Sequence, residues 1–167
     1  MVIIRMKNPV VCGFLILLLS FPVWANTHSV ENVKELKQAL KQASSGDHIL
    51  LAKGIYPGNF VIEHSLTLHC EDGATLDGQH QNDTLRIKAP HVTIQHCRIQ
   101  NWGDDLTAMN AGIFAENNAH HVFIEKNQFQ GDTFGIWLDK VEHARVYRNR
   151  IQSNTCRSNQ GQLTRYR

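Results

Sequence analysis

Two consecutive stretches of about 22 residues repeat one pattern, and this repeat restricts the folds open to the chain more than any other feature does. Shifting residues 112–131 by 22 or 23 positions places Gly112 on Gly135 and Asn127 on Asn149. A fixed period of this length is typical of repeat proteins, in which each repeat buries its apolar face against its neighbours. We therefore expect a solenoid.

Short segments with alternating apolar residues indicate strands from residue 66 onward. They begin 26, 30 and 22 residues apart with no helix-length segment between them. The pattern predicts an all-β fold, a right-handed parallel β-helix of about four coils. A β-sandwich, the alternative, needs two-residue hairpin turns, for which the chain has only a couple of candidates. The residues expected to face the core are Leu66, Leu68, Val92, Ile94, Val122, Ile124, Phe129, Ala144, Val146 and Ile151.

The N-terminal region has the features of an export signal. Two basic residues precede an apolar run that ends at Pro22, and residues 23–25 offer a cleavage site. The run is too short to span a membrane. We predict a signal peptide at 1–25, the β-helix at 26–154 and an aberrant or disordered tail at 155–167, which has a single aliphatic residue.

One amphipathic helix is expected at residues 33–43, where apolar residues recur at helical spacing. Asn32 is the predicted N-cap, and Glu35 completes a capping box. Because a β-helix exposes unpaired strand edges at its ends, we expect this helix to cover the first coil.

Charge and cysteine content narrow the range of partners. Without the signal peptide the chain has equal numbers of basic and acidic residues, 15 of each, which gives no reason to expect nucleic acid or an anionic membrane as a partner. Cys70 and Cys97 are free to pair in an oxidising compartment. However, Cys70 aligns with His96 rather than Cys97, so we expect the thiols to point apart and to act as small core residues.

Polar residues recur at fixed places in the coils. Asn127 and Asn149 follow equivalent strands, where a corner needs a left-handed backbone or a side chain that bonds the backbone. Stacked amides at strand spacing can bond along the column, and Cys97 in the preceding coil predicts that the ladder begins at Asn127.

Three histidines form a second column. Two interpretations fit it, a shared copper or zinc ion or solvated turn residues; we favour the turns and predict no metal site. These are His91, His121 and His143.

No pair of carboxylates is placed for glycoside cleavage, so we predict no catalytic residues.

The repeat is interrupted at residues 101–112 by a loop about eight residues longer than the spacing requires. Long loops on rigid scaffolds often carry function. Its apolar residues either pack over the coil or contact a partner. We predict partner binding at Trp102, Asp104, Asp105 and Met109.

Four stretches of the chain carry a resemblance to a known family: "LKQALKQASSGDHILLAKGIYPGNFVI", "LTLHCEDGATLDG", "FGIWLDKVEHARVYRNRIQ" and, most specifically, "APHVTIQHCRIQNWGDDLTAMNAGIFAE". On these residues the chain resembles the NosD family of periplasmic β-helix proteins that mature nitrous oxide reductase. The resemblance covers roughly residues 32–154.

This resemblance implies a non-enzymatic periplasmic accessory protein without a firmly bound cofactor. The implied partners are ABC transporter subunits, a copper chaperone and apo nitrous oxide reductase, with copper handled by the pathway and the membrane reached only through the transporter. Family members have many more coils, so the loss of pattern after Asn154 suggests a truncated product that cannot replace the full-length protein. A carbohydrate-binding or carbohydrate-cleaving β-helix is the alternative function.

Overall fold

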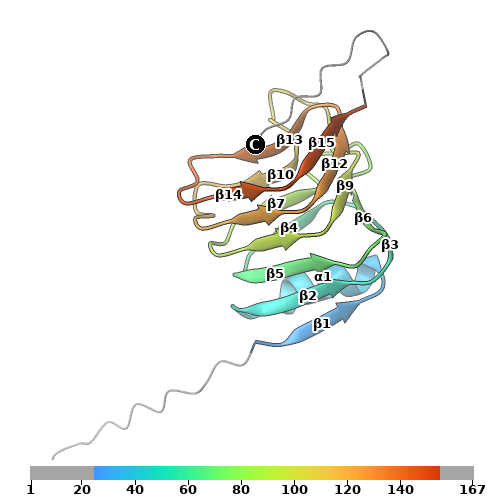
Figure 1. Cartoon of the computed structure of the whole chain (residues 1–167), viewed down its shortest axis with the longest axis vertical. Helices are drawn as coiled ribbons and strands as arrows, with labels where there is room; N and C mark the ends of the chain where they lie inside the picture. The colour runs from blue at the N-terminus through green and yellow to red at the C-terminus, as the bar shows by residue number, and fades with distance from the viewer. Residues whose placement is uncertain (1–24, 155–167) are drawn as a thin grey trace, which may run out of the picture.

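The computed structural model describes residues 25–154, which form a parallel β-helix with one helix at its N-terminal end (Figure 1). A complete coil passes in turn through three parallel sheets, here called A, B and C. Sheet A contains β1 (Thr27–Val30), β2 (Asp47–Leu51), β5 (Leu66–Cys70), β8 (Thr93–Gln95), β11 (Phe123–Glu125) and β14 (Arg145–Tyr147). Sheet B contains β3 (Gly54–Pro57), β6 (Ala74–Asp77), β9 (Arg98–Gln100), β12 (Gln128–Gly131) and β15 (Arg150–Ser153). Sheet C contains β4 (Phe60–Ile62), β7 (Leu85–Ile87), β10 (Ala111–Ala115) and β13 (Phe134–Leu138).

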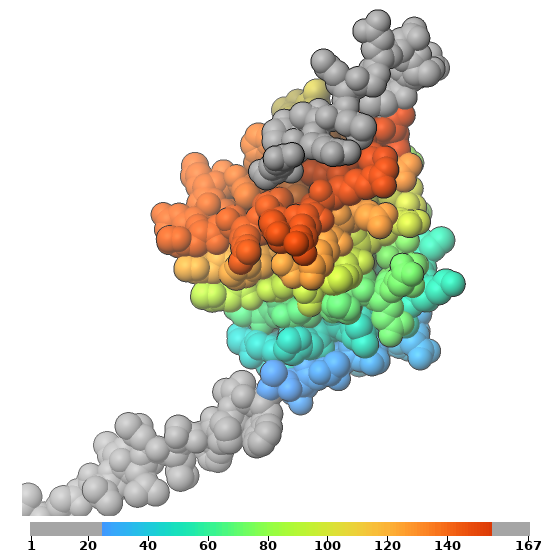
Figure 2. Space-filling model, viewed as in Figure 1, coloured from blue at the N-terminus to red at the C-terminus, as the bar shows by residue number. Residues whose placement is uncertain are grey.

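The predicted fold class is therefore confirmed, but the predicted number of coils is wrong. Sheet A has six strands rather than about four, because β1 and β2 extend it toward the N-terminus. The strand β1 escaped prediction because only one of its residues, Val30, is buried, so its sequence has no apolar alternation. Figure 2 shows the coils stacked in chain order from this strand to the last coil. The predicted signal peptide, apart from residue 25, and the predicted tail lie outside the described residues.

Coil register follows the predicted period. Ile124 pairs with Val146 and Phe129 with Ile151 in consecutive coils. Ile124 and Phe129 are buried, whereas Val146 and Ile151 are 47% and 51% exposed. The prediction of stacking is thus confirmed and the prediction of burial is wrong for the upper pair, because among the described residues no strand pairs with β14 or β15 on the far side.

Helix α1 (Val33–Gln42) begins and ends close to the predicted positions. Asn32 Oδ1 accepts a hydrogen bond from Glu35 N at 3.0 Å, and Glu35 Oε2 accepts one from Glu31 N at 2.9 Å. Hydrogen bonds from the Glu31 amide and the Asn32 side chain lower the pKa of Glu35. The helix buries Leu36 and Leu40 against the first coils and packs on β1, β2 and β4, as predicted for a cap. No helix within residues 25–154 is long and apolar enough to cross a membrane.

The corners on either side of sheet A depend on single left-handed residues. His91, His121 and His143 precede successive strands with φ of 55 to 56°. A second set follows the strands, with φ of 62°, 55° and 54° at His96, Lys126 and Arg148. Asn127 and Asn149 come directly after two of these left-handed residues and have no positive φ themselves. The sequence analysis offered two reasons for an asparagine at this corner, a left-handed backbone or a side chain that bonds the backbone. The structure shows the second.

The asparagine ladder begins at Asn127, as predicted. Asn127 Oδ1 accepts from Cys97 N at 2.9 Å, and its Nδ2 donates to Ile94 O at 2.9 Å. One coil higher, Asn149 Oδ1 accepts from Asn127 N at 2.9 Å, and its Nδ2 donates to Ile124 O at 2.7 Å. Each asparagine therefore satisfies backbone groups of the coil below it.

The structure corrects the expectation that the two core cysteines stay apart. Cys70 and Cys97 form a disulfide with their Cα atoms 4.9 Å apart. The strand register runs from Thr67 on Thr93 to His69 on Gln95 and would place His96 on Cys70. Because His96 turns the backbone through its left-handed conformation, Cys97 instead reaches the position above Cys70.

Candidate functional site

Among the described residues, the longest connection between strands that contains no helix joins β9 to β10 and lies at the corner between sheets B and C. We call residues 101–110 the corner loop. Asp105 organises its tip, since Asp105 Oδ1 accepts hydrogen bonds from Thr107 N at 2.8 Å and Ala108 N at 3.0 Å. The chain then returns through a hydrogen bond of 3.0 Å from Asn110 N to Asp105 O. The loop is thus a defined turn.

Trp102 anchors the corner loop in the core and is only 3% exposed. Its ring meets Phe129 edge-on, with ring centroids 6.4 Å apart. A Cβ atom on Gly131 would lie 2.5 Å from Trp102 Cε2, so the indole occupies the space that a side chain at residue 131 would need. The sequence analysis expected Trp102 either to pack over the coil or to contact a partner. Its burial supports packing over the coil.

The loop base is tied to the coil above by Thr133. Trp102 Nε1 donates to Thr133 Oγ1 at 2.9 Å, and this hydroxyl lies 3.0 Å from Gly103 O and 2.9 Å from Asn110 O. On the other side, Gly103 N donates to Asn82 O at 2.8 Å. Both ends of the corner loop are therefore held by neighbouring segments.

Asp77 supports the beginning of the loop from the coil below. Its Oδ2 accepts from Asn101 Nδ2 at 3.0 Å and from Gln100 Nε2 at 2.9 Å, and its Oδ1 accepts from Gln79 N at 3.0 Å. Burial disfavours the charged carboxylate, but the hydrogen bonds from Gln100, Gln79 and Asn101 outweigh it and lower the pKa of Asp77. An ionised Asp77 thus holds the entry to the corner loop in place.

The tip of the loop is exposed and combines apolar with acidic side chains. Met109 is 36% exposed and has a left-handed backbone with φ of 56°. Asp104 and Asp105 are exposed, and Leu106, which the sequence analysis did not single out, is 64% exposed. The signal that points to Leu106 is a large apolar residue between polar neighbours in a segment without a coil position. Leu106, Met109, Asp104 and Asp105 form the candidate site, which we call the loop tip.

An Arg86-centred cluster on the outer face of sheet C adjoins the end of the corner loop. Arg86 Nε donates to Asp83 Oδ2 at 2.9 Å, Arg86 Nη1 donates to Glu116 Oε1 at 3.1 Å, and the guanidinium lies 4.2 Å from the Phe114 ring centroid. Asp83 Oδ1 also accepts from Ala111 N at 2.9 Å. One guanidinium therefore compensates both carboxylates, and Asp83 also holds the start of β10, where the corner loop ends.

The histidine column forms as predicted. The ring centroids of His91 and His121 are 4.8 Å apart with planes inclined by 6°, and those of His121 and His143 are 4.7 Å apart with planes inclined by 12°. Imidazole lone pairs lie in the ring plane, so face-to-face rings do not direct them at a common point between the rings. No group of three or more His, Cys, Asp or Glu side chains within residues 25–154 is arranged to hold a metal ion. Desolvation and the neighbouring histidines, His143 foremost, lower the pKa of His121.

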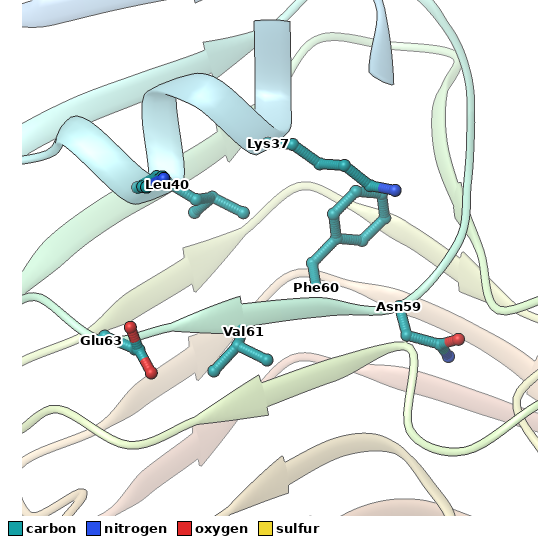
Figure 3. A pocket seen from close by; sticks show the side chains of 7 residues that line it. Lys37, Leu40, Asn59, Phe60, Val61 and Glu63 are labelled. Carbon is teal, nitrogen blue, oxygen red and sulfur yellow. The ribbon is translucent and has the colours of Figure 1, made fainter. Parts of the chain in front are cut away.

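A small open pocket lies between α1 and β4, far along the chain from the corner loop. Figure 3 shows Lys37 reaching from the helix across Phe60 of β4, with Val61 on the same strand and Glu63 directly after it. Its volume is about 200 Å³. Sites for drug-sized ligands usually measure roughly 300–1,000 Å³, so this pocket is the junction of the cap with the coil.

Comparisons with known proteins point to one family. The chain is 43% identical over 104 residues to the probable ABC transporter binding protein NosD of Pseudomonas aeruginosa and 36% identical over 104 residues to that of Stutzerimonas stutzeri. Each match covers 62% of this chain and 24% of the relative. A further protein of that name from Pseudomonas aeruginosa is 35% identical over 107 residues, which are 64% of this chain and 92% of the relative. No family model matches the chain.

A solved structure supports the fold. The alginate lyase of Paenibacillus sp. str. FPU-7 superposes with a TM-score of 0.50 at 21% identity, over 63% of this chain and 37% of the lyase. At this identity the likeness concerns the β-helix architecture alone.

Proposed function

We propose, because the chain belongs to the NosD family, that it is a periplasmic accessory protein that binds an ABC transporter and contributes to the maturation of nitrous oxide reductase. The match to 92% of a Pseudomonas aeruginosa relative named as a probable ABC transporter binding protein carries this proposal. The chain spans about a quarter of the length of the two most similar relatives reported above, so the proposal concerns the part that this segment plays.

In this proposal the chain acts by protein–protein contact rather than catalysis. Copper is the cargo of the pathway, supplied by a copper chaperone and inserted as a copper–sulfur cluster into the apo-reductase. Three carboxylates beside the corner loop have structural partners, since Asp83 and Glu116 both bond to Arg86 and Asp77 accepts hydrogen bonds from side-chain amides.

The loop tip is the surface that we assign to the partner. Its base is held by Trp102, Thr133 and Asp77, so little conformational freedom remains to be lost on binding. Leu106 and Met109 supply apolar contact area, while Asp104 and Asp105 favour a partner with basic residues around an apolar depression. A preorganised apolar tip flanked by like charges suits a specific contact with a folded protein.

Co-purification with the subunits of the proposed ABC transporter tests this proposal. We expect the chain to retain the transporter and L106D to reduce the retained amount at least about fivefold, because a charge replaces a buried apolar contact. I55D is the matched control, since Ile55 is also exposed, at 68%, but lies on β3. Failure of the wild-type chain to retain the transporter, or equal retention by both variants, contradicts the proposal.

A further inference from the structure

We propose that Cys70 and Cys97 are joined before the coil above them closes, so that the chain reacts with a disulfide oxidant while it is still incompletely folded. If the coils closed first, the thiols would be shielded from any oxidant and would stay reduced. A chain with this disulfide must therefore enter an oxidising compartment unfolded and fold there. The disulfide and its surroundings carry this inference, which is independent of the proposed transporter contact.

The disulfide lies inside the stack of coils. Both of its cysteines are 1% exposed. Cys70 pairs with Leu51 of the coil below, which is buried as well. On the side of the next coil, Asn127 Oδ1 accepts a hydrogen bond from Cys97 N at 2.9 Å, and Gln128 N donates to Cys97 O at 2.9 Å. Neighbouring coils therefore enclose the two cysteines from below and from above.

Formation of a disulfide by exchange needs more room than this enclosure leaves. The thiolate of one cysteine attacks a sulfur atom of the oxidant's disulfide, which gives a mixed disulfide and releases half of the oxidant as a thiolate. The thiolate of the second cysteine then displaces the other half. The two cysteine thiols together lose two electrons to the oxidant, and their two protons pass to the thiolates that it releases. The mixed disulfide places a bulky group directly on a sulfur atom, which the closed coils of this chain do not allow.

The order of residues along the chain permits oxidation before the coil above closes. Cys70 and Cys97 have a sequence separation of 27, and the segment between them contains β6, β7 and β8, which make one full coil. Asn127, which covers Cys97, follows 30 residues later. A chain that crosses a membrane with its N-terminus first therefore presents both thiols before the covering coil arrives.

This order gives the disulfide a function during folding. Once formed, it closes a covalent ring around a single coil, which reduces the conformational entropy of the chain before the next coil stacks on it. A route that exports proteins already folded would instead deliver this chain with both thiols reduced and buried.

Oxidation of the full chain in vitro tests the proposed order, in a C12S/C156S background so that only Cys70 and Cys97 can react. The chain is reduced in urea, refolded with reductant and then, after removal of the reductant, mixed with oxidised glutathione. Alkylation and mass spectrometry follow the free thiols, and circular dichroism follows the fold. We expect the refolded chain to lose its thiols at least about 30-fold more slowly than the chain in urea, because exchange must wait until the coils open.

Gln130→Cys in the same background is the matched control, because Gln130 is exposed on the coil that covers Cys97. Its new thiol should react with oxidised glutathione at rates within about threefold of each other with and without urea. A smaller slowing of the buried pair than about 30-fold, corrected by this control, would overturn the proposal. If the reduced chain does not refold, thiol loss should precede the β-sheet signal after oxidant is added, and the reverse order would equally overturn it.

Discussion

Replacing Asn127 with alanine should destabilise the β-helix by about 3 kcal/mol. The side chain is 1% exposed and bonds Cys97 N, Ile94 O and Asn149 Oδ1 at 2.9 to 3.1 Å. Alanine leaves the Cys97 amide and the Ile94 carbonyl without this side-chain partner inside the coil, and each such group costs about 1–3 kcal/mol. For a folded unit of about 130 residues this corresponds to a fall of roughly 10 °C in the unfolding midpoint.

Thermal unfolding followed by circular dichroism measures this loss. Q130A is the matched control, because Gln130 is an exposed amide three residues along the same coil, and its midpoint should stay within about 2 °C of the wild type. N149A should cost less than N127A, since Asn149 is more exposed. The double variant should lose less than the sum, because the hydrogen bond from Asn127 Nδ2 to Asn149 Oδ1 is lost in both single variants. A midpoint for N127A equal to that of Q130A would refute the reasoning.

Three further outcomes are expected. Cys97→Ser should lower the free energy of unfolding by about 3.5 kcal/mol, since the disulfide closes a loop with a sequence separation of 27, and urea titration with and without reductant checks this. Hydrogen bonds from the backbone amides of Ser44 and Asn26 lower the pKa of Asp47 from 3.8 to about 2. The contribution of this carboxylate to the free energy of unfolding is therefore present above pH 4 and is lost as the pH falls toward 2. D47N should flatten the dependence of the unfolding midpoint on pH in that range. Gly131→Ala should cost about 2 kcal/mol by clashing with Trp102, and the cost should disappear in a W102A background if the indole is the obstacle.

The period of the sequence predicted the architecture because a repeat protein repeats its contacts. Once Asn127 and Asn149 were placed in one column, strand spacing predicted bonding along the column, and Cys97 at the equivalent place in the preceding coil predicted its lower end. The helical cap was equally local, since Asn32 and Glu35 satisfy each other within one turn. Such features depend on residues that are close in sequence or equivalent by the repeat.

Features that depend on how the backbone leaves a strand were not predictable in this way. The pairing of Cys70 with Cys97 required the left-handed conformation of His96, which non-glycine residues adopt uncommonly and which the strand pattern does not show. Counting along an ideal strand places the two cysteines one position apart, and a single turn of the backbone removes that offset. The burial of Trp102 could not be predicted for a similar reason, because its ring fills the space left by Gly131, a residue in the next coil.

The corner loop shows how a stack of coils can carry a binding surface without losing its own stability. The loop departs from the coil, yet Trp102 returns an apolar ring to the core and Thr133, one coil higher, bonds to the first and last parts of the loop. Leu106 and Met109 are therefore raised from the surface by a segment whose base belongs to two coils. Changes at the tip should alter partner binding with little effect on unfolding, whereas changes at Trp102 or Thr133 should alter both, because the base carries the packing.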